Sequence, residues 1–309
     1  MRGSGVMKKA CDKGSQCIGT GLLLSVVLLL CVGCRHSGAS DGLKLQSEDY
    51  STARKHFQTH LVRHIPAPQD GQPLHAPAGV NQVEYSPGLH LQAWITPSSG
   101  SGQASGAKKP AVLFLHGGFA FGGDDWEMTQ PYRDAGYLVM MPILRGENGQ
   151  GGDYSMFYDE VTDVVAAADY LAKLPSVDAR HIYVAGHSVG GTLTLLAAMA
   201  SPRFRAAAAF SGAPDAISWS AGQPEYVVFD TSSLREYQMR SAIAFATSFK
   251  CPVRIYYGTE EPFFASGSQQ TSERAKTKGL DVEAVRVSGN HFSAVPEEIQ
   301  QSIRFFQSH

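Results

Sequence analysis

The stretch Gly186-His187-Ser188-Val189-Gly190 decides the fold of this chain, because of the residues on either side of it. Before it, His181–Ala185 is a short apolar run of the kind that forms a buried strand. After it, Gly191–Ala200 is rich in leucine and alanine and predicts a helix packed on a sheet. A Gly-x-Ser-x-Gly between a strand and a helix is the sequence form of a nucleophile elbow.

An elbow of this kind explains both its glycines and its serine. The backbone of Ser188 is strained in such a turn, and glycine at positions 186 and 190 relieves the crowding of strand against helix. The hydroxyl then stands at the C-terminal edge of the sheet, where the helix N-terminus stabilises negative charge. His187 points elsewhere in this geometry and is expected to be structural. The sequence thus predicts Ser188 as a catalytic nucleophile.

Length and composition favour one large α/β domain with appendages. The chain has 309 residues, of which 43% are hydrophobic, enough for a sizeable core. Its 26 basic and 28 acidic residues give a net charge of -2, and no run of either sign dominates, which argues against a nucleic-acid partner. No His-Glu-x-x-His occurs, so no metal is expected, and no other cofactor is implied. The sequence makes no prediction of the oligomeric state.

Residues 1–33 have the pattern of a signal peptide. Lys8, Lys9 and Lys13 precede an apolar run over residues 18–32, as a basic n-region precedes an h-region. The alternative is a single transmembrane helix, although a run of about 15 residues is short of the ~20 that span a bilayer. The sequence therefore predicts export.

Gly33-Cys34 resembles the lipobox of bacterial lipoproteins, with Cys31 where leucine is usual. The resemblance implies cleavage before Cys34 and lipidation of its thiol. Cys251 would then be left without a partner, which excludes a disulfide framework. Arg35 is not a signal for inner-membrane retention by the same resemblance. We therefore expect a protein anchored through Cys34 to a bacterial membrane, the outer membrane facing the periplasm.

Residues 34–79 are predicted to form a tether with a short helix, and residues 80–309 the catalytic domain. Apolar residues recur at helical spacing over 48–64, before a proline-rich stretch at 66–73. Beyond residue 80, predicted strands and helices alternate, which indicates a mostly parallel sheet of about eight strands with helices on both faces. The expected strands are Val83–Tyr85, Leu89–Ile95, Ala111–His116, Tyr137–Ile143, His181–Gly186, Ala206–Phe210, Val253–Tyr257 and Val282–Val287. The expected helices are Tyr158–Leu174, Gly190–Ala200, Leu234–Thr247, Ser268–Thr277 and Val295–Phe306, with a small cap segment at about 214–240.

A base and an acid for Ser188 are expected on loops at the same edge of the sheet. His291 directly follows the last predicted strand, where catalytic groups collect in open α/β sheets. Glu260 and Glu261 follow the strand before it, and one of them would orient His291 and stabilise the imidazolium. The order Ser, Glu, His along the chain is that of α/β-hydrolases.

An oxyanion hole needs two backbone N–H donors aimed at the developing alkoxide. Val189, directly after the nucleophile, supplies one. Gly118, in the loop His116-Gly117-Gly118-Phe119 after the first parallel strand, is the expected source of the other. His116 is expected to stabilise this loop.

Over residues 80 to 307 the chain resembles the catalytic domain of the prolyl oligopeptidase (S9) family, within the α/β-hydrolase superfamily. The matching motifs are His116-Gly117-Gly118, Leu144-Arg145-Gly146-Glu147-Asn148-Gly149, Val177–Gly191, Arg203–Ala207 and Ser211–Asp215. By the resemblance, Glu261 falls where the family has its catalytic aspartate. A tyrosine that supplies the second oxyanion donor in some members has no counterpart here.

The resemblance implies a serine hydrolase that works through an acyl-enzyme, most nearly a peptidase acting on short peptides. About 45 residues separate Cys34 from the domain, too few for the β-propeller that gates access in the family, and this favours a carboxylesterase or deacylase as the alternative. A third hypothesis is a catalytically inactive binding lipoprotein. The candidate walls of a substrate pocket are Phe119, Trp219, Tyr226 and Phe229, and the last three could equally pack a cap over the core.

Overall fold

The structure is a computed structural model that describes residues 43–69, 71–97 and 107–309. The expected signal peptide (1–33) and the lipidation site Cys34 lie outside these residues. In the described ranges, no helix combines the length and the apolar character that a bilayer span requires.

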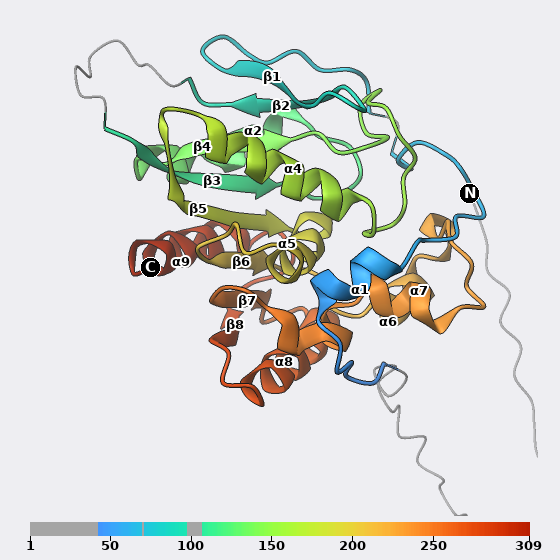
Figure 1. Cartoon of the computed structure of the whole chain (residues 1–309). Helices are drawn as coiled ribbons and strands as arrows, with labels where there is room; N and C mark the ends of the chain where they lie inside the picture. The colour runs from blue at the N-terminus through green and yellow to red at the C-terminus, as the bar shows by residue number, and fades with distance from the viewer. Residues whose placement is uncertain (1–42, 70, 98–106) are drawn as a thin grey trace, which may run out of the picture. The chain divides into compact units, whose positions relative to one another are not determined.

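An eight-stranded sheet forms the centre of the fold, in the order β1-β2-β4-β3-β5-β6-β7-β8 (Figure 1). β1 pairs with β2 and β2 with β4 in antiparallel fashion, and the other neighbours are parallel. The strands are β1 (Asn81–Ser86), β2 (Leu91–Ile95), β3 (Lys109–Leu115), β4 (Leu138–Pro142), β5 (Val177–His187), β6 (Ala207–Phe210), β7 (Val253–Gly258) and β8 (Val282–Val287). The predicted α/β-hydrolase fold with a mostly parallel sheet is confirmed.

Helices cover both faces of the sheet (Figure 1). The helices are α1 (Tyr50–His56), α2 (Gly123–Met128), α3 (Gln130–Asp134), α4 (Glu160–Lys173), α5 (Val189–Ala200), α6 (Ala216–Gly222), α7 (Leu234–Met239), α8 (Pro262–Lys276) and α9 (Val295–Gln307), with 3-10 turns η2 (Pro224–Tyr226) and η3 (Ala242–Ser248). Along β3, Leu113 packs in the core beneath α4 and α5, and Phe114 packs in the core beneath α3 and α9. Because both faces are covered, this strand is a continuous apolar run rather than an alternating one.

The segment ahead of the sheet packs on the domain instead of forming a tether from residue 43 onward. Leu43 and Tyr50 are buried, and the Tyr50 hydroxyl donates to the Met239 carbonyl oxygen at 2.8 Å. α1 is shorter than the pattern over 48–64 predicts, since the backbone turns extended after His56. Beyond it, the Val62 N–H donates to the cap segment instead of to a helical carbonyl.

The predicted cap segment contains α6, η2 and α7, and the expected helix over 234–247 divides into α7 and η3. Arg240, at the end of α7, is fully buried. Its guanidinium donates to Glu236 within the cap, to the Ser155 carbonyl oxygen of the core and to Thr59 of the leading segment. One buried cation therefore fixes the cap to two other parts of the domain.

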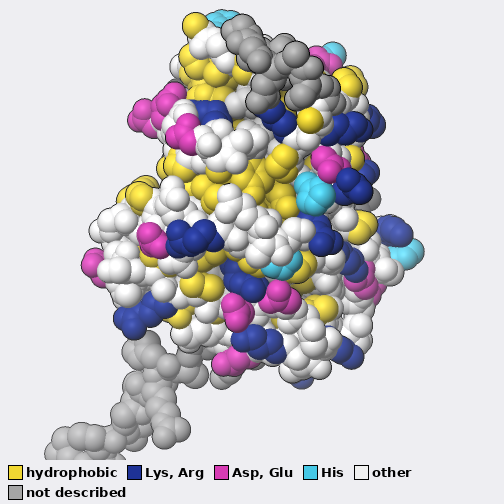
Figure 2. Space-filling view, turned by 90° about the vertical axis from the view of Figure 1, so that its left-hand side faces the viewer, with side chains coloured by type: hydrophobic (Ala, Val, Ile, Leu, Met, Phe, Trp, Pro, Cys, Tyr) yellow, Lys and Arg dark blue, Asp and Glu magenta, His cyan; other side chains and the backbone are white. Residues whose placement is uncertain are grey.

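Figure 2 shows the face of the molecule seen from the left-hand side of Figure 1. Basic and acidic side chains are interspersed over it, and hydrophobic side chains gather in a hollow in its middle. On this face the described residues therefore form no continuous stripe of one charge, in keeping with the net charge of -2.

Candidate active site

Ser188 lies at the sharp turn between β5 and α5, at the C-terminal edge of the parallel strands. Its backbone has φ 56° and ψ -114°, a strained conformation that folded proteins retain mainly at functional positions. A Cβ on Gly186 would lie 2.5 Å from the Gly190 carbonyl oxygen, and one on Gly190 would overlap the Leu115 carbonyl oxygen. The elbow therefore forms as the motif predicts, with the Ser188 side chain partly exposed.

His291 lies in the loop between β8 and α9 and is held by an acid from another loop. Its Nδ1 is 2.6 Å from Oε1 of Glu261, which caps α8. The imidazole stacks on Phe264, with ring centroids 5.2 Å apart and an interplanar angle of 16°. In the neutral form of the ring, with the carboxylate as acceptor, Nδ1 carries the proton and Nε2 has the lone pair.

Glu261 is the glutamate that the structure brings to His291, whereas Glu260 is exposed. The second oxygen of Glu261 accepts from the Ser211 hydroxyl at 2.6 Å and from the Gly258 N–H at 2.7 Å. Burial pushes the pKa of Glu261 upward, but the hydrogen bonds from His291, Ser211 and Gly258 outweigh it and the pKa is lowered. The carboxylate is therefore ionised at neutral pH, which suits a group that orients an imidazole.

His187, beside the nucleophile, holds the backbone of the His291 loop. Its Nε2 is 2.7 Å from the His291 carbonyl oxygen, and the two imidazole centroids are 4.6 Å apart. Because a carbonyl oxygen only accepts, Nε2 must carry the proton. Burial, and next the charge of His291, lower the pKa of His187 to about 4, so this side chain is neutral. Within the described residues, the Ser188 hydroxyl makes no hydrogen bond to His291, a contact that often tightens only when substrate binds.

The two expected oxyanion donors flank Ser188. Val189 is the first residue of α5, and Gly118 lies in the loop between β3 and α2. The loop is close to the nucleophile, since a Cβ built on Gly117 would lie 3.6 Å from the Ser188 Cβ. Among the described residues, the backbone N–H groups of Val189 and Gly118 have no hydrogen-bond acceptor. Both are therefore free to bind the oxygen of a substrate carbonyl.

His116, at the start of this loop, is held by a buried ion pair. Its Nε2 is 2.9 Å from Oε2 of Glu147, and its Nδ1 is 3.0 Å from the Gly117 carbonyl oxygen. Burial alone would lower the pKa of His116, but the charge and hydrogen bond of Glu147 raise it to about 9. The protonated ring donates from both nitrogens and fixes the backbone at Gly117.

The residues expected to wall the pocket separate into two places. Three of them pack together at the expected oxyanion loop: Phe119, Trp219 and Tyr226. The centroid of the Phe119 ring lies 6.2 Å from that of Trp219 and 5.1 Å from that of Tyr226. Phe229 lies elsewhere, 1% exposed and 4.0 Å below the Arg240 guanidinium. Phe229 therefore packs inside the cap and does not wall the predicted pocket. Its ring is held there by a cation–π contact with the buried Arg240.

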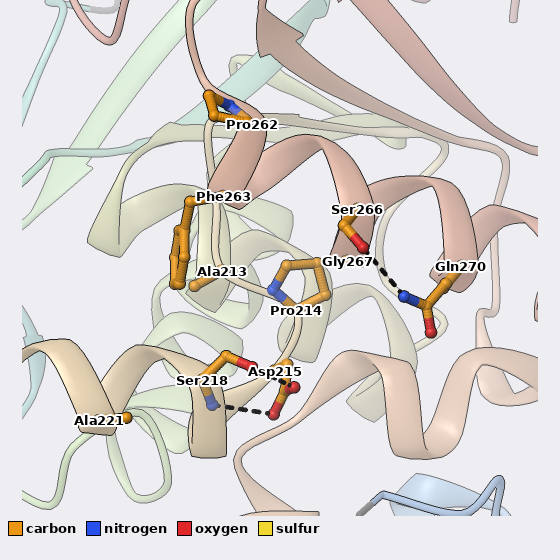
Figure 3. Close-up of a pocket in the computed structure, with 10 residues that line it drawn as sticks. All are labelled: Ala213, Pro214, Asp215, Ser218, Ala221, Pro262, Phe263, Ser266, Gly267 and Gln270. Carbon is orange, nitrogen blue, oxygen red and sulfur yellow. Dashed lines mark hydrogen bonds between the residues drawn. The ribbon is translucent and has the colours of Figure 1, made fainter. Parts of the chain in front are cut away.

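A cavity of about 320 Å³ is lined by residues of α6, of α8 and of the connection that leads into α6 (Figure 3). Pro262 and Phe263, which directly follow Glu261, form one side of it. The other lining residues come from the β6–α6 connection, from α6 and from α8: Ala213, Pro214, Asp215, Ser218, Ala221, Ser266, Gly267 and Gln270. This cavity was not predicted from the sequence, although the position of Pro262 and Phe263 beside the acid was a usable signal.

The polar groups of this cavity are largely engaged with one another. Figure 3 shows the Asp215 carboxylate turned toward Ser218, which donates to it from both its backbone N–H and its hydroxyl. Gln270 donates to the Ser266 hydroxyl. The walls left to a ligand are therefore mainly apolar. In the part of the chain that the structure describes, no cluster of histidine, cysteine and acidic side chains could hold a metal ion.

Comparison with known proteins places these features in one family. A sequence model described as "Prolyl oligopeptidase family" matches residues 124–304. The uncharacterized peptidase YuxL of Bacillus subtilis is 26% identical over 203 residues, which cover 58% of this chain and 30% of that protein. The match to the family extends over more than half of the chain and includes Ser188, Glu261 and His291.

Solved structures share the fold. A puromycin-hydrolyzing peptidase of Mycobacterium tuberculosis superposes with a TM-score of 0.65 at 21% identity, over 74% of this chain and 38% of that one. A putative dienelactone hydrolase of Klebsiella pneumoniae gives a TM-score of 0.55 at 18% identity, over 74% of this chain and 98% of that one. The chain thus spans about a third of the length of YuxL and of the puromycin-hydrolyzing peptidase.

Proposed function

The chain belongs to the prolyl oligopeptidase family, and from this premise we propose that it is a serine peptidase of the S9 type that cleaves short peptides through an acyl-enzyme. The observation that carries the proposal is the hydrogen bond of 2.6 Å between His291 and Glu261, made on loops beside the strained Ser188 elbow. Catalysis of this kind needs a nucleophile, a base and an orienting acid at one edge of the sheet.

The geometry supports a specific catalytic role for each of these residues. Ser188 Oγ attacks the substrate carbonyl carbon and His291 Nε2 takes the hydroxyl proton, while Glu261 stabilises the resulting imidazolium. The carbonyl oxygen becomes an oxyanion, which accepts from the N–H groups of Val189 and Gly118. His291 then gives its proton to the departing amine, and an acyl-enzyme remains. Water, deprotonated by His291, attacks this ester, and His291 then returns the proton to Ser188 Oγ as the acid product leaves.

The cavity beside Glu261 is the proposed site for the side chain of the substrate residue whose carbonyl group acylates Ser188. Its volume of about 320 Å³ lies at the lower end of small-ligand pockets. Its apolar walls and the engaged Asp215 favour an uncharged side chain of moderate size. A series of aminoacyl anilides tests this, and the proposal expects kcat/KM to be higher for leucine and phenylalanine than for aspartate or lysine. Equal kcat/KM values across the series would show that the cavity does not bind this side chain.

The proposed activity is tested by comparing kcat/KM on an aminoacyl anilide and on a short-chain ester, with Ser188→Ala as the blank. Anilide turnover within about a hundredfold of the ester, a barrier difference below ~3 kcal/mol, is expected of a site that protonates an amine leaving group. Ester turnover without measurable anilide cleavage would make the protein a carboxylesterase. Turnover that survives Ser188→Ala would exclude a serine hydrolase, and no turnover of either substrate would favour a binding protein.

The proposal includes a location, argued from the sequence. A basic n-region, an apolar run over 18–32 and the pair Gly33-Cys34 support export and lipid anchoring at Cys34 to a bacterial membrane, the outer membrane facing the periplasm. Cys34→Ser should move the protein from the membrane to the soluble fraction and abolish incorporation of labelled palmitate. Cys17→Ser, ahead of the apolar run, is the matched control and should change neither. Unaltered fractionation of Cys34→Ser would instead favour a transmembrane helix.

A further inference from the structure

Gln69, which lies ahead of the region matched to the family, contacts the expected oxyanion loop. The Phe119 N–H donates to the Gln69 side-chain oxygen at 2.5 Å. Because a backbone N–H can only donate, the amide of Gln69 must present its oxygen here. Gln69, fifty positions before Phe119 in the chain, therefore binds the backbone amide group that directly follows Gly118.

The backbone of the loop is fitted closely to this contact. Gly118 has φ 69°, and a Cβ there would lie 2.6 Å from the Gln69 oxygen. On the same segment, a Cβ on Gly71 would lie 2.8 Å from the Ala120 Cβ. At Gly71 a side chain would meet the Ala120 methyl group, and at Gly118 it would displace the Gln69 amide from the Phe119 N–H. The segment and the loop are thus in close contact around the Gln69 amide.

A second amide side chain holds the far end of the loop. Asn148 accepts from the Phe121 N–H at 2.8 Å and donates to the Gln72 carbonyl oxygen at 2.9 Å. Phe119 and Phe121 thus both have their N–H groups bound from outside the loop. The Gly118 N–H lies between the fixed His116 and the bound Phe119, and among the described residues it donates to no acceptor.

We propose that Gln69 is a positioning residue of the oxyanion hole. By binding the Phe119 N–H, it fixes the peptide plane after Gly118 and so keeps the Gly118 N–H directed toward the oxygen of a carbonyl attacked by Ser188. An oxyanion donor contributes only when it is already aimed at the site where charge develops. The catalytic consequence rests on the proposed function, whereas the clamp on the loop stands independently of it.

The kinetic test replaces Gln69 by methionine, which has a similar length but no acceptor oxygen, and uses the activated short-chain ester. Gln69→Met should lower kcat about 10- to 100-fold, somewhat less than the loss of a whole oxyanion donor, with KM changed less than about threefold. A peptide boronic acid, which forms a tetrahedral adduct with Ser188, should bind more weakly by a similar factor. Gln58→Met is the matched control, because Gln58 is exposed on the same leading segment, and should leave all three quantities unchanged.

The structural test does not depend on activity. Amide hydrogen exchange of the peptide that covers residues 117–121 should be at least about tenfold faster in Gln69→Met and unchanged in Gln58→Met, because a lost acceptor frees the Phe119 N–H to exchange. Gln69→Glu keeps an acceptor oxygen and should retain the exchange rate of the wild type. Circular dichroism and Tm show whether each variant is folded.

The outcomes separate the two proposals. Faster exchange in Gln69→Met, with a fall in kcat, supports the positioning role. Unchanged exchange, or a kcat within twofold of the wild type, overturns it, and a higher kcat would mean that Gln69 blocks the site instead. If the wild type hydrolyses neither ester nor anilide, the proposed function fails, and the exchange rates still decide whether Gln69 clamps the loop.

Discussion

Two His–Glu pairs lie at the same edge of the sheet, and they differ in what surrounds them. The His291–Glu261 pair spans 2.6 Å, and its imidazole side chain is 27% exposed. The His116–Glu147 pair spans 2.9 Å, and its imidazole side chain is 2% exposed. Both pairs join one imidazole nitrogen to a glutamate oxygen, Nδ1 in His291 and Nε2 in His116, so their roles must come from the remaining atoms of each ring.

The second ring nitrogen makes the difference. In His116 it donates to the Gly117 carbonyl oxygen, so both nitrogens carry protons and the raised pKa of about 9 keeps them there. In His291 only Nδ1 is engaged among the described residues, which leaves Nε2 to accept a proton. A histidine with a carboxylate at one nitrogen becomes a base only if its other nitrogen faces the cleft. The first pair thus fixes a loop, and the second is suited to proton transfer.

The largest effect is expected for His291→Gln, which removes the proposed base. Loss of the base should lower kcat by at least about 10⁴-fold, leaving the weak rate that binding and the oxyanion donors supply. Stability should change little, because the ring is partly exposed. Steady-state kinetics on the activated ester and a thermal melt measure both effects. Residual activity above one per cent of the wild type would show that His291 is not the base.

Glu261→Gln probes the acid of the same pair. An amide can hold the ring but favours the wrong tautomer and leaves the imidazolium unstabilised, so kcat should fall about 10³-fold or more. The neighbouring Glu260→Gln removes the same charge from an exposed side chain and should stay within about twofold of the wild type. Equal losses in the two variants, measured on the same substrate, would contradict the assignment of the acid.

The difference between the pairs also shows what the sequence could predict. The central strands were recognisable from the sequence. Strands that are covered on both faces, such as 138–142 and 253–258, consist largely of consecutive apolar residues. Ser188 and His291 were recognisable because the elbow has a fixed local motif and the last loop has a fixed place at the sheet edge. The choice between Glu260 and Glu261 came from the family resemblance, because adjacent loop carboxylates carry no periodicity.

What the sequence did not reveal depends on contacts between irregular segments. Glu147 lies in a loop 31 residues after His116, and no spacing rule joins them. Gln69 is one of several polar residues in a proline-rich stretch, where turns suppress any helical or strand pattern. Phe229 follows an apolar run that could face a pocket or a core, and the buried Arg240 decides between them. Such partners are determined by tertiary packing.

His116→Gln tests the structural pair. The change leaves Glu147 buried with its charge uncompensated, and loss of one partner of a buried ion pair costs on the order of 3 kcal/mol. We therefore expect the free energy of unfolding, measured by urea denaturation at pH 7, to fall by about that amount. His181→Gln, at a pair whose imidazole is 39% exposed, is the control and should cost less than about 1 kcal/mol. Similar losses in the two variants would mean that burial does not set the strength of the pair.

The smallest expected effect is on the pH dependence of the free energy of unfolding, to which His116 contributes. The pKa of His116 is raised from 6.5 to about 9 on folding, so its stabilising contribution is fully present below pH 6.5 and is lost as the pH rises through 9. Between pH 7 and pH 9 the stability gap between wild type and His116→Gln should therefore shrink by about 2 kcal/mol. Burial also raises the pKa of Glu298, to about 8, with the same sign, but this group is present in both proteins and cancels in the difference. A gap that stays constant over this range would mean that His116 is neutral in the folded state, and the contrast between the two histidines would then have to rest on geometry alone.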